Sequence, residues 1–176
     1  MDSNIKIQFF KTNFGELILG DYQGKLCLCD WRYRSKRKQI DARVQQTLQA
    51  DFIEESSALH EHVILELQAY FRGERQQFTI PIMMLGSEFQ QTVWSALTKI
   101  PYGKTISYAA LSQRIGDEKA VRAVAAANGA NALAIIIPCH RVIASNGDLQ
   151  GYAGGINTKK KLLDLEGAIH QTYLSF

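Results

Sequence analysis

The chain has 176 residues, of which 46% are hydrophobic and 21% are charged, and 20 Lys and Arg against 17 Asp and Glu give a formal net charge of +3. This composition excludes a disordered chain, a collagen-like fibre and a disulfide-stapled miniprotein, and no apolar run approaches the roughly 20 residues that span a bilayer. The charge permits binding to nucleic acid without requiring it. Three cysteines, and an opening segment Met1–Lys6 with no basic-then-apolar pattern, predict reduced thiols, no signal peptide and a cytoplasmic location.

The first part of the chain has the pattern of a small sheet. Short apolar or alternating runs at Ile5–Phe10, Glu16–Leu19 and Leu26–Cys29 are separated by glycine-containing turns. These runs predict an antiparallel three-stranded meander. Residues two apart on a regular strand point to the same face, so Cys27 and Cys29 are expected to share one face.

A basic cluster follows the third run and consists of Arg32, Arg34, Lys36, Arg37 and Lys38. Such a cluster is most often a solvated loop, and the alternative is an electrostatic aid to binding a polyanion. The sequence leaves both interpretations open.

From Asp41 onward the hydrophobic period becomes helical. Gly73 is expected to end the second of two helices, and Phe78–Ile80 is expected to form a strand before Pro81. The stretch 81–86 is the candidate domain boundary. Two stripes predict two helices, the first with Val44, Leu48 and Phe52 and the second with Leu59, Val63, Leu67 and Tyr70.

The rest of the chain has the pattern of a series of capped helices. Ser87 with Gln90 predicts a capping box at the head of a helix over 89–97. Ser107 is expected to cap a helix over 108–115, and Asp117 a second helix over 120–128. Two short helices joined by a tight glycine-containing turn are typical of a helix-turn-helix, although many helical domains contain such a corner.

Alanines fill most positions of the second of these helices, including Ala120, Ala123 and Ala125. Alanine favours the helix, and small side chains let the helix backbone approach closely whatever it faces. Arg122 is the only long charged side chain in the middle of the helix. Taken alone, Arg122 is interpreted as a surface residue that bonds water.

An apolar run, Ala132–Ile137, ends at Pro138 and is followed at once by Cys139 and His140. The run predicts a buried strand or extended segment, and the fixed backbone of Pro138 would present the thiol rigidly. A thiolate is a nucleophile, and nearby cationic or hydrogen-bonding groups raise its population. A lone cysteine after an apolar run is nevertheless most often an inert core residue.

The last helix carries an acid where a helix disfavours one. Asn157 is expected to cap this helix and Gly167 to close it, which places Glu166 in the last turn. The negative end of the helix dipole lies there, so Glu166 is expected to have a compensating partner. His140 is the candidate partner.

These residues together resemble the O6-alkylguanine-DNA alkyltransferase family. The resemblance covers 89–167, and the first part of the chain matches only in outline. It implies an α/β (α+β) fold, with an RNase H-like antiparallel sheet and helices over 1–85 and a helix-turn-helix or winged-helix-like catalytic domain over 86–176. The matching motifs are Pro101–Tyr108, Arg122–Val124, Asn131, Pro138–Val142, Gly151–Gly155 and Leu162–Leu163 leading to Glu166–Gly167.

The resemblance implies DNA repair by direct reversal. The protein, a monomer in the absence of DNA, would bind the minor groove of double-stranded DNA and flip out a guanine alkylated at O6, with O4 of thymine as a second candidate. It would then move the alkyl group irreversibly onto its own Cys139, with no cofactor. Flipping is required because the O6 substituent is stacked inside the duplex.

The same resemblance implies roles for the catalytic residues. His140 would deprotonate Cys139 through a water, and Glu166 would hold the imidazole and stabilise its cationic form. Asn131 would tie the helix-turn-helix to the active-site turn. Tyr108 would rotate a phosphate outward and donate a proton or hydrogen bond to the leaving guanine.

For DNA, the resemblance implies that Arg122 enters the base stack in place of the flipped base. The alanine-rich helix with Ala120, Ala123 and Ala125 would lie in the minor groove, where small side chains fit. The base pocket would be lined by Val142, Tyr152, Ala153 and Gly154.

Some members of this family carry a zinc ion, for which Cys27, Cys29, His60 and His62 offer the right residue types. Zinc knuckles usually separate their cysteines by two to four residues, whereas one residue separates Cys27 from Cys29. We therefore expect no metal.

Two other classes of protein compete with this assignment. A cysteine hydrolase or acyltransferase would use Cys139 and His140. This class of protein does not explain the helix-turn-helix, Arg122 or Tyr108. A DNA-binding regulator or non-repairing lesion sensor would make the cysteine incidental. The branch of the family that binds lesions without repairing them replaces the cysteine with Trp, so Cys139 favours a competent acceptor.

Overall fold

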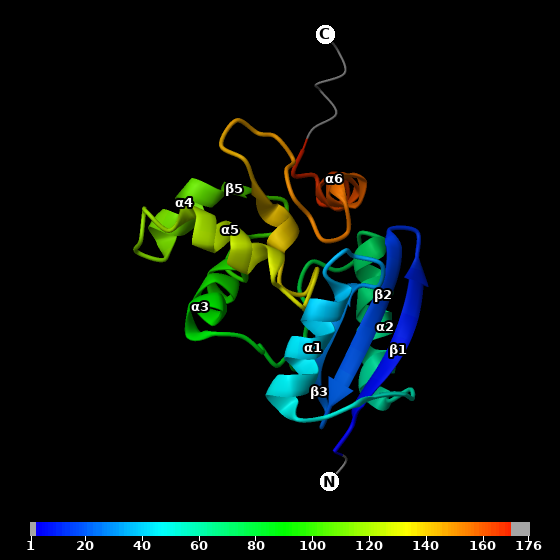
Figure 1. Ribbon diagram of the computed structural model, residues 1–176. Helices are drawn as coiled ribbons and strands as arrows, with labels where there is room; N and C mark the ends of the chain where they lie inside the picture. The colour runs from blue at the N-terminus through cyan, green and yellow to red at the C-terminus, as the bar shows by residue number, and fades with distance from the viewer. Residues whose placement is uncertain (1–2, 170–176) are drawn as a thin grey trace.

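A four-stranded sheet forms the first part of the protein, whose structure is a computed structural model that describes residues 3–169 (Figure 1). The strand order is β3-β2-β1-β4, and the antiparallel pairing of the first three strands confirms the meander. Met1 and Asp2, in the segment where no signal peptide is expected, lie outside the described residues. The strands are β1 (Ile5–Thr12), β2 (Gly15–Tyr22), β3 (Lys25–Trp31) and β4 (Phe52–Glu54).

The fourth strand corrects the expected first helix. Phe52 was assigned to a helical stripe, but it pairs with Ile5 as β4 runs parallel to β1. The helix ends earlier because Gln49 adopts a left-handed conformation with φ of 49° and reverses the chain. The prediction for Phe52 is therefore wrong, because an apolar residue at helical spacing serves equally well at a sheet edge.

Two helices cover the two faces of this sheet, as Figure 1 shows. Helix α1 (Arg37–Leu48) packs Val44 against the face that carries Ile18, and helix α2 (Ala58–Phe71) packs Leu67 against the face that carries Leu17. Neighbouring residues of β2 alternate between the two cores, as the period of a strand requires. The sheet is therefore buried on both sides.

A β-bulge separates Cys27 from Cys29. Asp21 of β2 pairs with Leu26 and the next pair is Gly20 with Leu28, so Cys27 has no partner of its own. The extra residue shifts the alternation, and Cys27 joins the core under α1 whereas Cys29 joins the core under α2. The expectation that both point to one face is wrong.

The predicted strand over 78–80 is also wrong, since no strand is present within those residues, all of which the structure describes. The residues that lie along the edge of β3 come directly after this segment, at 81–83. The amide of Leu26 donates to the carbonyl of Pro81 and the amide of Met83 donates to the carbonyl of Leu26. Pro81 cannot donate a ladder hydrogen bond, and here it only accepts one.

The second part of the described chain is mainly helical. The capping box of Ser87 and Gln90 is present, and Ser107 caps its helix as predicted. The parallel strands β5 and β6 form a small two-stranded sheet beside these helices. The elements are α3 (Glu88–Leu97), β5 (Ile106–Ser107), α4 (Tyr108–Arg114), α5 (Val121–Gly129), the 3-10 turn η1 (Cys139–Arg141), β6 (Val142–Ile143) and α6 (Ile156–Leu165).

Two predicted caps are wrong by a few residues. Asp117 accepts a hydrogen bond from the amide of Lys119 in the turn that precedes α5, and the helix begins at Val121 after Ala120. Asn157 lies inside the first turn of α6, because Gly155 is the residue before that helix. Asp and Asn form tight turns as readily as caps, so the local sequence did not separate the two uses.

One core joins the two parts of the chain. The apolar run 132–137 lies against β3, where the amide of Cys29 donates to the carbonyl of Ala132 and the amide of Ala134 donates to the carbonyl of Cys29. The run is buried as predicted, with isolated bridges in place of a regular strand. Within residues 3–169 no helix is long and apolar enough to cross a membrane.

Candidate active site

Cys139 opens the 3-10 turn η1 at the end of the run that lies against β3. Only 4% of its surface is exposed. Asn131 holds both ends of the run, because its Nδ2 donates to the carbonyl of Ile137 at 2.9 Å and its Oδ1 accepts from the amide of Leu133 at 2.9 Å. Asn131 thus connects the end of α5 to the cysteine turn, which is the link expected from the resemblance.

The environment of Cys139 keeps its thiol protonated. Burial raises the pKa of Cys139, although a hydrogen bond from Asn131 and the positive charges of Lys159 and Arg34 act in the opposite direction. A protonated thiol is a weak nucleophile. Any reaction at this sulfur therefore needs a base that removes its proton.

His140 and Glu166 form a buried pair beside this thiol. His140 Nε2 lies 2.7 Å from Glu166 Oε1, and neither side chain is exposed. Burial lowers the pKa of His140 although Glu166 opposes this, so the ring is neutral and donates its Nε2 proton to the carboxylate. Nδ1 is then a buried acceptor, and it has no hydrogen-bond partner among the described residues. The partner predicted for Glu166 is confirmed.

Glu166 has two further partners that the sequence did not reveal. Arg141 donates from Nε to Oε2 and from Nη2 to Oε1, each at 2.9 Å, and the hydroxyl of Tyr70 donates to Oε1 at 2.7 Å. Burial alone would raise the pKa of Glu166, but the bonds from His140 and Arg141 outweigh it and lower the pKa to about 2. Glu166 is therefore a fixed anion.

A cavity of about 620 Å³ opens beside the thiol. It brings together seven of the predicted site residues, namely Tyr108, Arg122, Ala125, Asn131, Cys139, Tyr152 and Ala153. Two residues predicted for the base pocket, Val142 and Gly154, are not among its lining. Val142 is fully buried in β6, and Gly154 packs so closely on Trp31 that an added Cβ would lie 2.8 Å from the indole.

The cavity wall opposite α5 is a loop that Lys159 holds in place. Lys159 is fully buried on α6 and donates to the carbonyls of Val142 at 2.6 Å and Gln150 at 3.1 Å. The carbonyl of Gln150 also accepts from the Tyr108 hydroxyl at 3.3 Å. Burial lowers the pKa of Lys159 to about 8. This lysine, which the sequence did not single out, positions the loop that carries Tyr152.

The structure resolves which face of α5 is outward. Val124 and Ala127 are buried, whereas Arg122, Ala123 and Ala125 are exposed. Ala120, just before the helix, is half-buried. The outward face therefore carries small side chains with one arginine at the mouth of the cavity, an arrangement that allows close approach to a broad surface.

Comparisons with known proteins agree with this geometry. The family model described as "6-O-methylguanine DNA methyltransferase, DNA binding domain" matches residues 88–168. A methylated-DNA–protein-cysteine methyltransferase of Methanosarcina acetivorans is 40% identical over 160 residues, which are 90% of this chain and 96% of that protein. The chain belongs to the methylated-DNA–protein-cysteine methyltransferase family.

Other members extend the match. A methyltransferase of Mycobacterium bovis with the same name is 54% identical over 101 residues, which are 57% of this chain and 61% of that one. The crystal structure of Mycobacterium tuberculosis OGT in complex with DNA superposes with a TM-score of 0.80, at 37% identity and 93% coverage of both chains. The resemblance to O6-alkylguanine-DNA alkyltransferases and the predicted fold class are confirmed.

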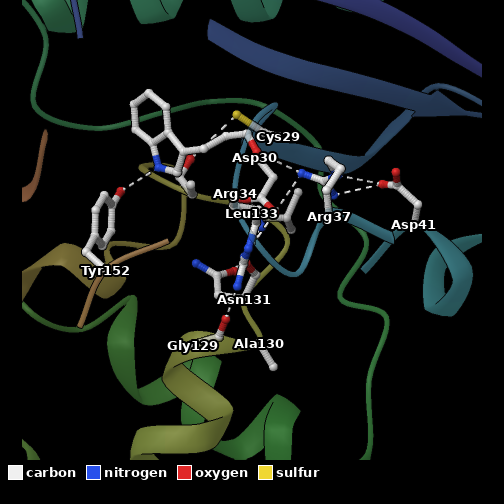
Figure 2. A network of polar contacts seen from close by, with 12 residues as sticks. Cys29, Asp30, Arg34, Arg37, Asp41, Gly129, Ala130, Asn131, Leu133 and Tyr152 are labelled. Atoms are coloured by element: carbon white, nitrogen blue, oxygen red, sulfur yellow. Dashed lines mark hydrogen bonds and ion pairs between the residues drawn. The ribbon is translucent and has the colours of Figure 1, made fainter. Parts of the chain in front are cut away.

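In this member of the family, part of the basic cluster is structural (Figure 2). Arg34 is buried, and its guanidinium contacts Asp30 Oδ2 at 3.0 Å and the carbonyl of Gly129, the last residue of α5, at 2.6 Å. Arg37 contacts the same Asp30 oxygen at 3.0 Å and also pairs with Asp41. For Arg34 and Arg37 the solvated-loop interpretation is therefore wrong, whereas the polyanion interpretation stays a prediction.

We expect Arg34→Leu to destabilise this methyltransferase by about 3 kcal/mol, because removing one partner of a buried ion pair leaves the other poorly compensated. DNA binding should weaken as well, since Arg34 holds the end of α5. Urea unfolding and a DNA titration measure the two effects. Arg37→Leu is the matched control, because Arg37 shares Asp30 but makes no hydrogen bond to α5, both of which lie within the described residues. It should lower stability and leave DNA affinity unchanged, and equal loss of affinity in both variants would contradict this role of Arg34.

Proposed function

We propose that the protein repairs alkylated DNA by direct reversal. It binds double-stranded DNA, flips an O6-alkylguanine into the cavity beside Cys139 and transfers the alkyl group irreversibly to the sulfur of that residue. The observation that carries this proposal is a buried, protonated thiol at the cavity, next to a neutral histidine whose carboxylate partner is a fixed anion. O4-alkylthymine is a second candidate substrate.

The transfer is a single displacement in which Cys139 loses one proton and the leaving guanine takes one up. His140 Nδ1 accepts the proton of Cys139 through a water, and Glu166 stabilises the imidazolium that forms. The thiolate attacks the alkyl carbon, the S–C bond forms and the C–O6 bond breaks with its electron pair going to guanine. Tyr108, whose pKa is raised by burial and by Cys139, is a neutral donor that supplies a proton or hydrogen bond to the leaving guanine. Asn131 fixes the turn on which the sulfur lies.

The DNA would lie along the outward face of α5. Ala120, Ala123 and Ala125 let the helix enter the minor groove, and Arg122 takes the place of the flipped base. Tyr108 rotates a phosphate outward. Tyr152 and Ala153 contact the flipped base, with Val142 and Gly154 supporting them from behind. We propose that the protein is cytoplasmic, is a monomer in the absence of DNA and uses no cofactor. We also propose that it is divided into units 1–85 and 86–176.

One experiment separates this function from its rivals. The protein is incubated with duplex DNA that carries labelled O6-methylguanine, and its intact mass is then measured together with the label on Cys139. We expect a gain of one methyl group per protein and no second turnover. Repeated turnover would indicate a cysteine hydrolase or acyltransferase, and lesion binding without a mass gain would indicate a regulator or lesion sensor.

A further inference from the structure

Tyr70 connects the sheet-bearing part of the protein to the proposed proton relay. It lies on α2 and is fully buried, and its ring contacts those of Phe71, Phe78 and Tyr102 with centroids 5.5 Å, 5.6 Å and 6.3 Å away. Its hydroxyl donates to Glu166 Oε1 at 2.7 Å. Aromatic packing fixes the ring, so the hydroxyl is held at one place on the carboxylate.

This bond completes the coordination of one carboxylate oxygen. Oε1 accepts hydrogen bonds from His140 Nε2, Arg141 Nη2 and the Tyr70 hydroxyl, whereas Oε2 accepts one from Arg141 Nε. Hydrogen bonds to an ionised group are short and strong, and each draws negative charge from the acceptor. The three donors on Oε1 hold Glu166 in one orientation and share the charge that faces the imidazole.

The bonds on Oε1 have a consequence for the base. A carboxylate with fewer donors would hold the proton of an imidazolium more tightly, and His140 would then be protonated at higher pH. The charged groups that act on His140 are Glu166, Arg141 and Lys159. Glu166 also lies near Tyr102, whose hydroxyl donates to the carbonyl of Leu165 at 3.3 Å and not to the carboxylate.

We propose that Tyr70 is a positioning residue for alkyl transfer, which orients Glu166 against His140 and keeps the imidazole neutral and ready to accept the proton of Cys139. This inference rests on the proposed function. It gives the first part of the chain a direct role in the reaction, because α2 supplies one of the four hydrogen bonds on the relay carboxylate.

Tyr70→Phe tests this proposal because it removes one oxygen and keeps the ring. In single-turnover methyl transfer from duplex DNA, we expect the acid limb of the pH–rate profile to move up by about one pH unit, so that the rate near that limb falls about tenfold. At pH values above this limb, the rates of Tyr70→Phe and of the wild type should converge. Tyr102→Phe is the matched control, and it should leave the profile in place.

An NMR titration of the His140 imidazole provides a readout that does not depend on transfer. Its pKa should rise in Tyr70→Phe and should fall when 3,5-difluorotyrosine, a stronger donor, replaces Tyr70. An unmoved imidazole pKa, or a rate loss that is equal at every pH and follows a fall in melting temperature, would show that Tyr70 is only structural. If the wild-type chain gains no methyl group, the proposed function fails, whereas a normal wild-type reaction with an unmoved Tyr70→Phe profile overturns this inference alone.

Discussion

Cys139→Ala is expected to abolish methyl transfer and to leave binding to the lesion intact. The substitution removes the acceptor sulfur, so intact-protein mass should show no gain at any incubation time. The helix α5 and the cavity wall do not depend on this side chain, and the dissociation constant for duplex DNA with O6-methylguanine should change by less than about threefold. Mass spectrometry and a fluorescence titration measure the two quantities.

Cys27→Ala is the control for this prediction. Burial raises the pKa of Cys27 to about 12 and also raises the pKa of Cys29, so neither thiol is ionised at neutral pH. Both lie in the core beside the sheet and not at the cavity. The control should gain one methyl group like the wild type. A methyl group found on the Cys139→Ala protein would place the acceptor elsewhere and contradict the mechanism.

The sequence signals that agree with the structure are local or chemical. The capping box at Ser87, the adjacency of Cys139 and His140, and the acid that directly follows α6 each express a constraint within a few residues. Glu166 is the clearest case, because an acid against the helix dipole implied a partner before any partner was visible. The motifs of the resemblance then gave the fold of the second part and its order of elements.

Residues whose partner lies far along the chain could not be predicted in this way. Tyr70 has the helical spacing of a core residue, and only the fold brings its hydroxyl to Glu166, 96 positions later. Arg34 looked like a member of a solvated basic run, yet it bonds a carbonyl 95 positions away. The prediction for Phe52 was wrong for the same reason, because apolar spacing does not show whether the residue lies in a helix or at a sheet edge.

Arg122→Ala is expected to slow repair of duplex DNA by about 10- to 100-fold. The reason is that a side chain filling the vacated space offsets part of the free-energy cost of unstacking the flipped base. Repair of the same lesion in a single strand, where no base pair must be opened, should keep its rate within about twofold. Within residues 3–169, Arg122 forms no hydrogen bond or ion pair with Cys139, His140 or Glu166, so the chemical step should be unaffected. Single-turnover rates on the two substrates give the comparison.

A loss of positive charge alone must be separated from the loss of an inserted side chain. Lys161→Ala on α6 removes one exposed charge away from α5, and it should slow neither reaction. If Arg122 acted only by contacting a phosphate, its removal would weaken binding to both substrates and the defect would fade at high salt. An abasic site opposite the lesion lowers the cost of flipping, so the Arg122→Ala defect should shrink on that duplex. A normal rate of Arg122→Ala on intact duplex would rule out insertion of Arg122 into the base stack.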